Sequence, residues 1–159
     1  MPVRTLAAAA LVLLLTGCEG LLGGEEAARI PLQPAADGGY APVRILLKPE
    51  MNPVAFNLHA DFAWGRRDEG SQWNTYRATL STGGKVIRAQ EFSVNSPENS
   101  NVSTSSSPPP NSLRHTMLLV DLPGEAEYEI AIAAVKPVAV TLNAPQLGVR
   151  INVPRLPKF

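Results

Sequence analysis

The sequence predicts an all-β protein, an antiparallel β-sandwich of about eight strands with an immunoglobulin-like or jelly-roll arrangement. Apolar and polar residues alternate with a period of two in several segments, most clearly over Val54–Trp64 and Glu127–Val135. Turn-forming residues separate these segments at short intervals. No window after residue 18 has the pattern of a capped amphipathic helix, so strands alone are expected to form the core.

The expected strands begin after residue 40. In order they are Val43–Lys48, Val54–Trp64, Trp73–Leu80, Val86–Val94, Leu113–Asp121, Glu127–Val135, Val138–Leu142 and Leu147–Val153. Gly83 and Gly84 predict a tight hairpin before the fourth strand, because glycine adopts positive φ without steric cost. The apolar pattern of that strand shifts phase around Arg88 to Glu91, which predicts a β-bulge.

Alternation also predicts which side chains face the core. In Val54–Trp64 the even-numbered residues are apolar and are expected to point inward, whereas Asn57, His59 and Asp61 are expected to point together toward solvent. In Trp73–Leu80 the side chains of Tyr76, Ala78 and Leu80 are expected to face the core. Trp73, Thr75, Arg77 and Thr79 then lie on the outer face.

Two stretches lack the pattern of packed structure. Residues 18-40 are rich in Gly, Ala, Glu and Pro and are interpreted as a flexible tether. Residues 95-112 form a low-complexity run of Ser, Asn and Pro, which predicts a disordered loop within the domain. The expected organisation is therefore a leader over residues 1-17, the tether over 18-40, and one β-sandwich domain over 41-159.

The leader carries the most specific motif. One cation, Arg4, precedes an apolar run from Leu6 to Leu15, and Leu15-Thr16-Gly17-Cys18 follows with the only cysteine of the chain. These four residues resemble the lipobox of bacterial lipoprotein signal peptides. The resemblance implies that the signal is cleaved before Cys18 and that Cys18 carries the lipid. Glu19 after the cysteine resembles the class that is directed to the outer membrane, with the domain facing the periplasm.

Two alternatives to a lipidated cysteine are a secretory signal cleaved elsewhere and an uncleaved transmembrane helix. The apolar run of about ten residues is short for a bilayer core that needs about twenty. A single cysteine in an exported protein would be a free thiol without a disulfide partner, whereas acylation explains why the cysteine is there. The lipoprotein interpretation accounts for both observations.

Composition excludes several functions. Lys and Arg number 14, as do Asp and Glu, so the formal net charge is zero and there is no basic footprint for nucleic acid. A single cysteine allows no internal disulfide, so the apolar core must hold the domain together.

Candidate catalytic residues are few. His59 shares a strand face with Asn57 and Asp61, which suggests a metal site or an oriented base, although outward strand positions are more often simply polar. His115 has no acidic neighbour in the sequence and is interpreted as structural. Nucleophile-elbow, phosphate-binding and zinc motifs are absent from the sequence, so neither enzyme activity nor a cofactor or metal is expected.

A binding module needs fewer characteristic residues in its sequence than an enzyme does. An exposed Trp73 beside Arg66, Arg67 and Arg77 is a candidate surface for a protein partner or a sugar ring. The alternative interpretation is that Trp73 covers the edge of the sandwich. We therefore expect a non-catalytic, lipid-anchored interaction or assembly subunit of the cell envelope, with carbohydrate binding as the alternative.

Overall fold

The computed structural model describes residues 23–62, 74–94, 112–139 and 141–155. The described residues form eight strands and one short 3-10 helix, η1 (Pro49–Met51). The strands are β1 (Glu25–Pro31), β2 (Tyr40–Leu47), β3 (Val54–Phe62), β4 (Asn74–Thr82), β5 (Lys85–Val94), β6 (Ser112–Val120), β7 (Ala126–Ala134) and β8 (Leu142–Ile151). The predicted all-β class is confirmed.

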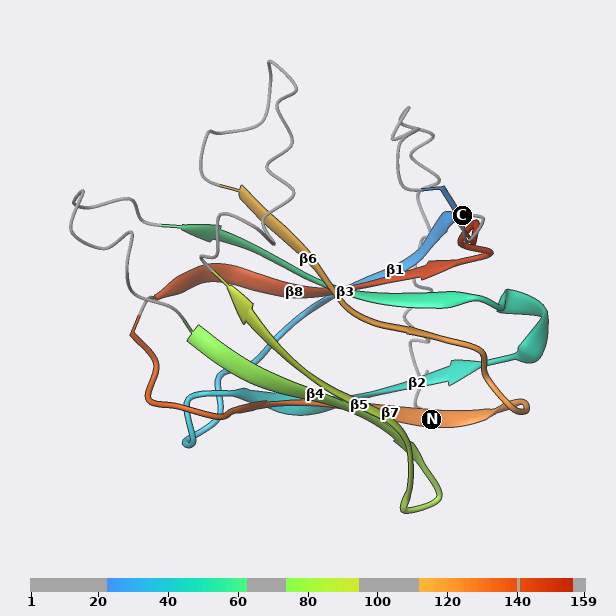
Figure 1. Cartoon of the computed structure of the whole chain (residues 1–159), viewed down its shortest axis with the longest axis horizontal. Helices are drawn as coiled ribbons and strands as arrows, with labels where there is room; N and C mark the ends of the chain where they lie inside the picture. Colours follow the sequence, from blue (N-terminus) through green and yellow to red (C-terminus); the bar gives the residue numbers. More distant parts are fainter. Residues whose placement is uncertain (1–22, 63–73, 95–111, 140, 156–159) are drawn as a thin grey trace, which may run out of the picture.

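The strands form two four-stranded antiparallel sheets that pack face to face (Figure 1). Sheet A has the order β1-β8-β3-β6, and sheet B has the order β2-β7-β4-β5. Only the β4–β5 hairpin joins neighbours within one sheet, because every other connection crosses from one sheet to the other. These two strand orders, with connections that alternate between the sheets, are those of a jelly roll. The structure is therefore a jelly roll and not an immunoglobulin-like sandwich, the other arrangement that the sequence allowed.

The core lies between the sheets, and the alternation predicted most of it correctly. Phe56, Leu58, Tyr76 and Leu80 point inward and are at most 1 % exposed. Phe56 and Leu58 belong to β3 of sheet A, and the buried side chains of β4 and β7, Tyr128 among them, face these two residues from sheet B. Burying one such side chain contributes about 1.5–3 kcal/mol. With no disulfide available, this apolar layer holds the two sheets together.

The predicted tether is wrong over residues 25–31, because these residues form β1 at the edge of sheet A. Ala28 and Ile30 pair with Val149 and Leu147 of β8 and pack partly against the core. An edge strand has one hydrogen-bonded neighbour and few inward side chains, so its apolar alternation is short. A register shift between Glu26 and Ala28 interrupts that alternation further.

The chain between β7 and β8 also differs from expectation. Val138–Leu142 was predicted as a strand, but no described residue before Leu142 in this stretch pairs in a sheet. Instead β8 begins at Leu142 and continues to Ile151 as one strand. The run predicted as disordered, 95-112, lies outside the described residues apart from Ser112, where β6 begins.

The predicted hairpin and bulge are both present in sheet B. Gly83 and Gly84 have φ of 53° and 78° between β4 and β5. The register changes from Leu80↔Arg88 to Ser81↔Val86, so the extra residue of the bulge is Ile87, one residue before the predicted range of Arg88 to Glu91.

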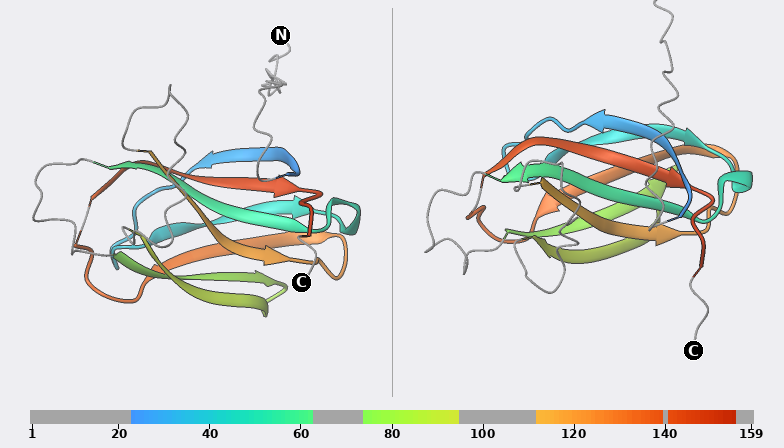
Figure 2. Two further views of the ribbon diagram at one scale, coloured as in Figure 1. Left: turned by 45° about the horizontal axis from the view of Figure 1, so that its top comes forward. Right: turned by 90° about the horizontal axis from the view of Figure 1, so that it is seen from above.

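The sandwich has two distinct ends. β1 begins at the end that also carries η1, the β4–β5 hairpin, the 121–125 turn and residues 152–155; we call this the entry end (Figures 1 and 2). It is cross-linked by backbone hydrogen bonds from Asn152 to Met51 (2.9 Å) and from Val153 to Pro53 (3.1 Å). The opposite end, the far end, carries the β1–β2 and β7–β8 connections.

Candidate functional site

The candidate site is the outer surface of sheet A, where polar side chains from all four strands meet. We call it the polar face and define it by Glu26, Arg29, Asn57, His59, Thr116 and Arg150. Across its middle, Arg29, Gly148, Asn57 and Thr116 lie side by side in register on β1, β8, β3 and β6. Because Gly148 has no side chain, this row has a gap between Arg29 and Asn57.

Asn57 faces outward as predicted, but the prediction that it lies in solvent is wrong, because it is 2 % exposed. Thr116 Oγ1 donates a hydrogen bond of 2.7 Å to Asn57 Oδ1. Asn57 Nδ2 is buried and has no hydrogen-bond partner among the described residues. β3 lies between β8 and β6, so neighbours that are distant in sequence cover a short side chain that would be exposed on an edge strand.

His59 is half-buried, and its ring lies over the gap at Gly148. A Cβ at Gly148 would come within 2.5 Å of His59 Nε2 and 2.8 Å of Cδ2. The imidazole therefore occupies the space that a side chain at position 148 would fill.

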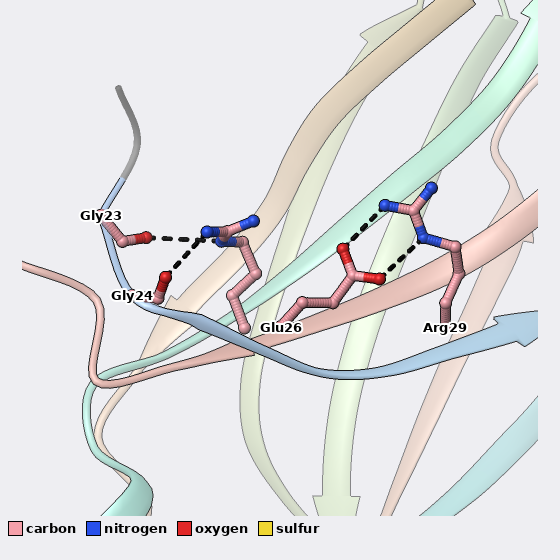
Figure 3. A network of polar contacts seen from close by, with 5 residues as sticks. Gly23, Gly24, Glu26 and Arg29 are labelled. Atoms are coloured by element: carbon pink, nitrogen blue, oxygen red, sulfur yellow. Dashed lines mark hydrogen bonds and ion pairs between the residues drawn. The ribbon is translucent and has the colours of Figure 1, made fainter. Parts of the chain in front are cut away.

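Glu26 and Arg29 form an ion pair on β1 with hydrogen bonds of 3.0 and 2.7 Å (Figure 3). The hydrogen bond from Arg29 is the main reason that the pKa of Glu26 lies below its ordinary value. Partial burial opposes this shift, whereas the positive charges of Arg29, His59 and Arg150 favour it. The carboxylate of Glu26 is thus the anionic centre of a mainly cationic group.

Arg150 joins the polar face to the entry end. Its side chain is 7 % exposed and donates hydrogen bonds of 3.3 Å to the carbonyl of Gly23 and 2.8 Å to that of Gly24 (Figure 3). Both glycines have positive φ, 55° and 78°. Arg150 therefore fixes the backbone that leads into β1.

The predicted trio of Asn57, His59 and Asp61 occupies alternate positions of β3, and its members differ in burial. Asp61 is exposed and pairs in register with Asn143 and Ser112 toward the far end, away from the row at Gly148. In the part of the chain that the structure describes, no three His, Cys, Asp or Glu side chains are placed to hold a metal ion.

His115 lies on the inner side of β6, where its ring stacks on Phe92 of β5 at a centroid distance of 5.0 Å. This contact joins the adjacent edges of the two sheets. The structure thus supports the structural role predicted for His115.

Of the predicted binding residues, only Arg77 lies within the described residues. It is exposed on the outer face of sheet B and forms an ion pair with Glu91 of β5. Beside it, the hydroxyl groups of Thr75 and Ser93 share a hydrogen bond of 3.3 Å. Trp73, Arg66, Arg67 and Cys18 lie outside the described residues.

Sequence reasoning missed Glu26, Arg29 and Arg150. The first two fall in the stretch interpreted as a tether. Arg150 falls within the predicted strand Leu147–Val153, but its alternation with Val149 and Ile151 gave no sign that the carbonyls of Gly23 and Gly24 would bind it.

Comparison with protein families, with curated proteins and with solved structures finds no significant match to this chain. Within the described ranges, no helix is long and apolar enough to cross a membrane.

Proposed function

We propose that the protein is a bacterial lipoprotein held in the outer membrane by acyl chains on Cys18, with a non-catalytic jelly roll that serves as an interaction or assembly subunit in the periplasm. The observation that carries this proposal is the lipobox-like Leu15-Thr16-Gly17-Cys18 after an apolar run. Two or more acyl chains hold a protein stably at a membrane, whereas one chain holds it only marginally.

The charges on the described surface support an interaction role. Arg29 pairs with Glu26, Arg44 with Glu129, and Arg77 with Glu91, so both flat faces carry paired charges of both signs. Such faces favour recognition by a protein of mixed charge over binding of a polyanion.

Fractionation of cell envelopes tests the anchor. The native protein should remain in the membrane pellet after a high-salt wash and carry acylated Cys18 by mass spectrometry, whereas Cys18→Ser should appear in the soluble fraction. Cys18→Ser in the pellet at native levels would overturn the anchor.

Crosslinking in native envelopes tests the interaction role separately. Pull-down of the anchored protein after crosslinking should recover a protein partner reproducibly. Arg77→Ala and Glu91→Ala, which disturb the outer face of sheet B only, should serve as surface variants for mapping the contact. Recovery of no protein from any envelope preparation would contradict the role.

Carbohydrate binding is a second candidate, which we keep because β4 presents Thr75 and Arg77 on a polar outer surface directly after Trp73. A Trp beside polar side chains can stack on a sugar ring. Loss of retention on envelope glycan by Trp73→Ala, with Trp73→Phe as the control that keeps an aromatic ring at the same position, would support this function. Unchanged retention would remove its basis.

A further inference from the structure

The structure fixes how far the domain can lie from the lipidated residue. Gly23, the first described residue, follows Cys18 by five positions. Five fully extended residues span at most about 18 Å. The entry end of the sandwich must therefore stay close to whatever holds Cys18.

The starting point of this span is secured by three kinds of contact. Arg150 holds the carbonyls of Gly23 and Gly24. Gly23 and Gly24 also pack so closely on the C-terminal segment that a Cβ at either position would clash, at 2.2 Å from Pro154 and 2.6 Å from the carbonyl of Ile151. β1 itself pairs with β8 along its length. The short span therefore cannot be lengthened without breaking sheet A.

The far end lies well beyond this reach. β8 has ten residues between the far end and the entry end, which at the rise of an antiparallel strand is about 33 Å. The residues between Cys18 and Gly23 are therefore long enough to separate the lipid from the entry end, but they are too short to separate it from the entry end by the length of the sandwich.

We propose that the entry end is a membrane-facing surface apposed to the lipid headgroups, and that the far end is presented away from the membrane to partners. This inference rests on the proposed acylation of Cys18. The membrane-facing surface is formed by η1, the β4–β5 hairpin, the 121–125 turn and residues 152–155, and its neighbour is the lipid headgroup layer.

The charges of the entry end indicate that it lies near the lipid headgroups without being bound to them by electrostatic attraction. Lys48 pairs with Glu125 at 3.5 Å, and Arg155 pairs with Asp121, which compensates these charges. Glu25 and Glu50 add exposed acidic groups, and Lys85 of the β4–β5 hairpin adds an exposed basic group. Anionic headgroups would repel these acids only over about a Debye length, 8–10 Å in physiological salt. The tether, and not electrostatic attraction, sets the orientation.

Spin labelling of the full-length, acylated protein tests the inference. Because acylation blocks the only native thiol, a nitroxide can be placed uniquely on Glu50→Cys at the entry end or on Ala36→Cys at the far end; both positions are exposed. The proteins are reconstituted into phosphatidylcholine vesicles that contain a lipid with a Ni²⁺-chelating headgroup. Relaxation by the headgroup Ni²⁺ should be several-fold stronger at position 50 than at position 36, and this difference should persist in high salt.

A lengthened tether provides the matched control. Insertion of about twenty Gly and Ser residues before Gly23 adds an r.m.s. span of about 25 Å, and the difference between the two labels should then largely disappear. Equal relaxation at both positions with the native tether would overturn the inference. A difference that survives the insertion, or vanishes in high salt, would mean adhesion of a surface and would also overturn it.

Mass spectrometry of the same samples separates the two proposals. Acylated Cys18 with no difference between the labels rejects the orientation alone, whereas unmodified Cys18 rejects the lipoprotein function and the orientation with it.

Discussion

The imidazole of His59 lies where the side chain of residue 148 would be, because Gly148 leaves the space that His59 Nε2 occupies. Gly148→Ala would place a Cβ 2.5 Å from this atom, so the ring must move. Crowding of this kind costs about 1–3 kcal/mol. We expect Gly148→Ala to lower the free energy of unfolding in urea by that order.

A double-mutant cycle isolates the cause. In a His59→Ala background the added methyl group has room, so Gly148→Ala should cost clearly less there than in the native protein. Equal costs in the two backgrounds would show that the imidazole is not what Gly148 accommodates.

Gly24, which leads into β1, and Gly84, in the β4–β5 hairpin, form a matched pair that tests how tightly the backbone before β1 is packed. Both have a φ of 78°, but a Cβ at Gly84 meets no atom within 4 Å, whereas one at Gly24 lies 2.6 Å from the carbonyl oxygen of Ile151. Gly84→Ala should cost about 1–2 kcal/mol for the left-handed conformation alone. Gly24→Ala should cost more in urea unfolding and should increase amide exchange along β1. Similar costs would indicate that the lead-in to β1 is not tightly packed.

The two buried tyrosines predict a loss of stability at alkaline pH. Asn74 Nδ2 donates a hydrogen bond of 3.1 Å to the hydroxyl of Tyr76, whose ring centroid lies 6.0 Å from that of Tyr40. Burial raises the pKa of both tyrosines above the ordinary value near 10. Above pH 10 the unfolded chain therefore releases these protons before the folded protein does, and the free energy of unfolding falls by up to about 1.4 kcal/mol per pH unit for each proton.

Urea unfolding between pH 8 and pH 11 measures this fall. Tyr40→Phe removes one titrating group, so its curve should decline less steeply above pH 10 than that of the native protein. Parallel curves would show that Tyr40 does not titrate differently in the folded and unfolded states.

The sequence predicted the fold class because alternation over central strands such as β3, β4 and β7 reports directly on a core between two sheets. The agreement in strand number is partly fortuitous. β1 was missed, while Val138–Leu142 was counted as a separate strand, although none of its described residues before Leu142 pairs in a sheet. Edge strands with few inward side chains are difficult to predict from the sequence, because their alternation of apolar and polar residues is short.

The candidate site was less predictable, because its contacts join residues far apart in the chain. The outward phase of Asn57 was correct, but its burial depends on neighbours in β6 and β8. Arg150 binds carbonyls more than 120 residues earlier in the sequence. Local patterns give the face of a strand, whereas strand order decides what covers that face.

The ion pair between Glu26 and Arg29 predicts a modest acid sensitivity on β1. Because the pKa of Glu26 is lowered in the folded protein, mainly by the hydrogen bond from Arg29, its stabilising contribution is present above pH 4.5 and is lost as the pH falls through the folded value. Both side chains are more than one third exposed, so the coupling should be only about 0.2–1 kcal/mol. A double-mutant cycle of Glu26→Gln and Arg29→Gln in urea at pH 7 should yield this coupling, and the same cycle at pH 3 should yield less. A coupling that is equal at the two pH values would contradict the role of the ionised carboxylate.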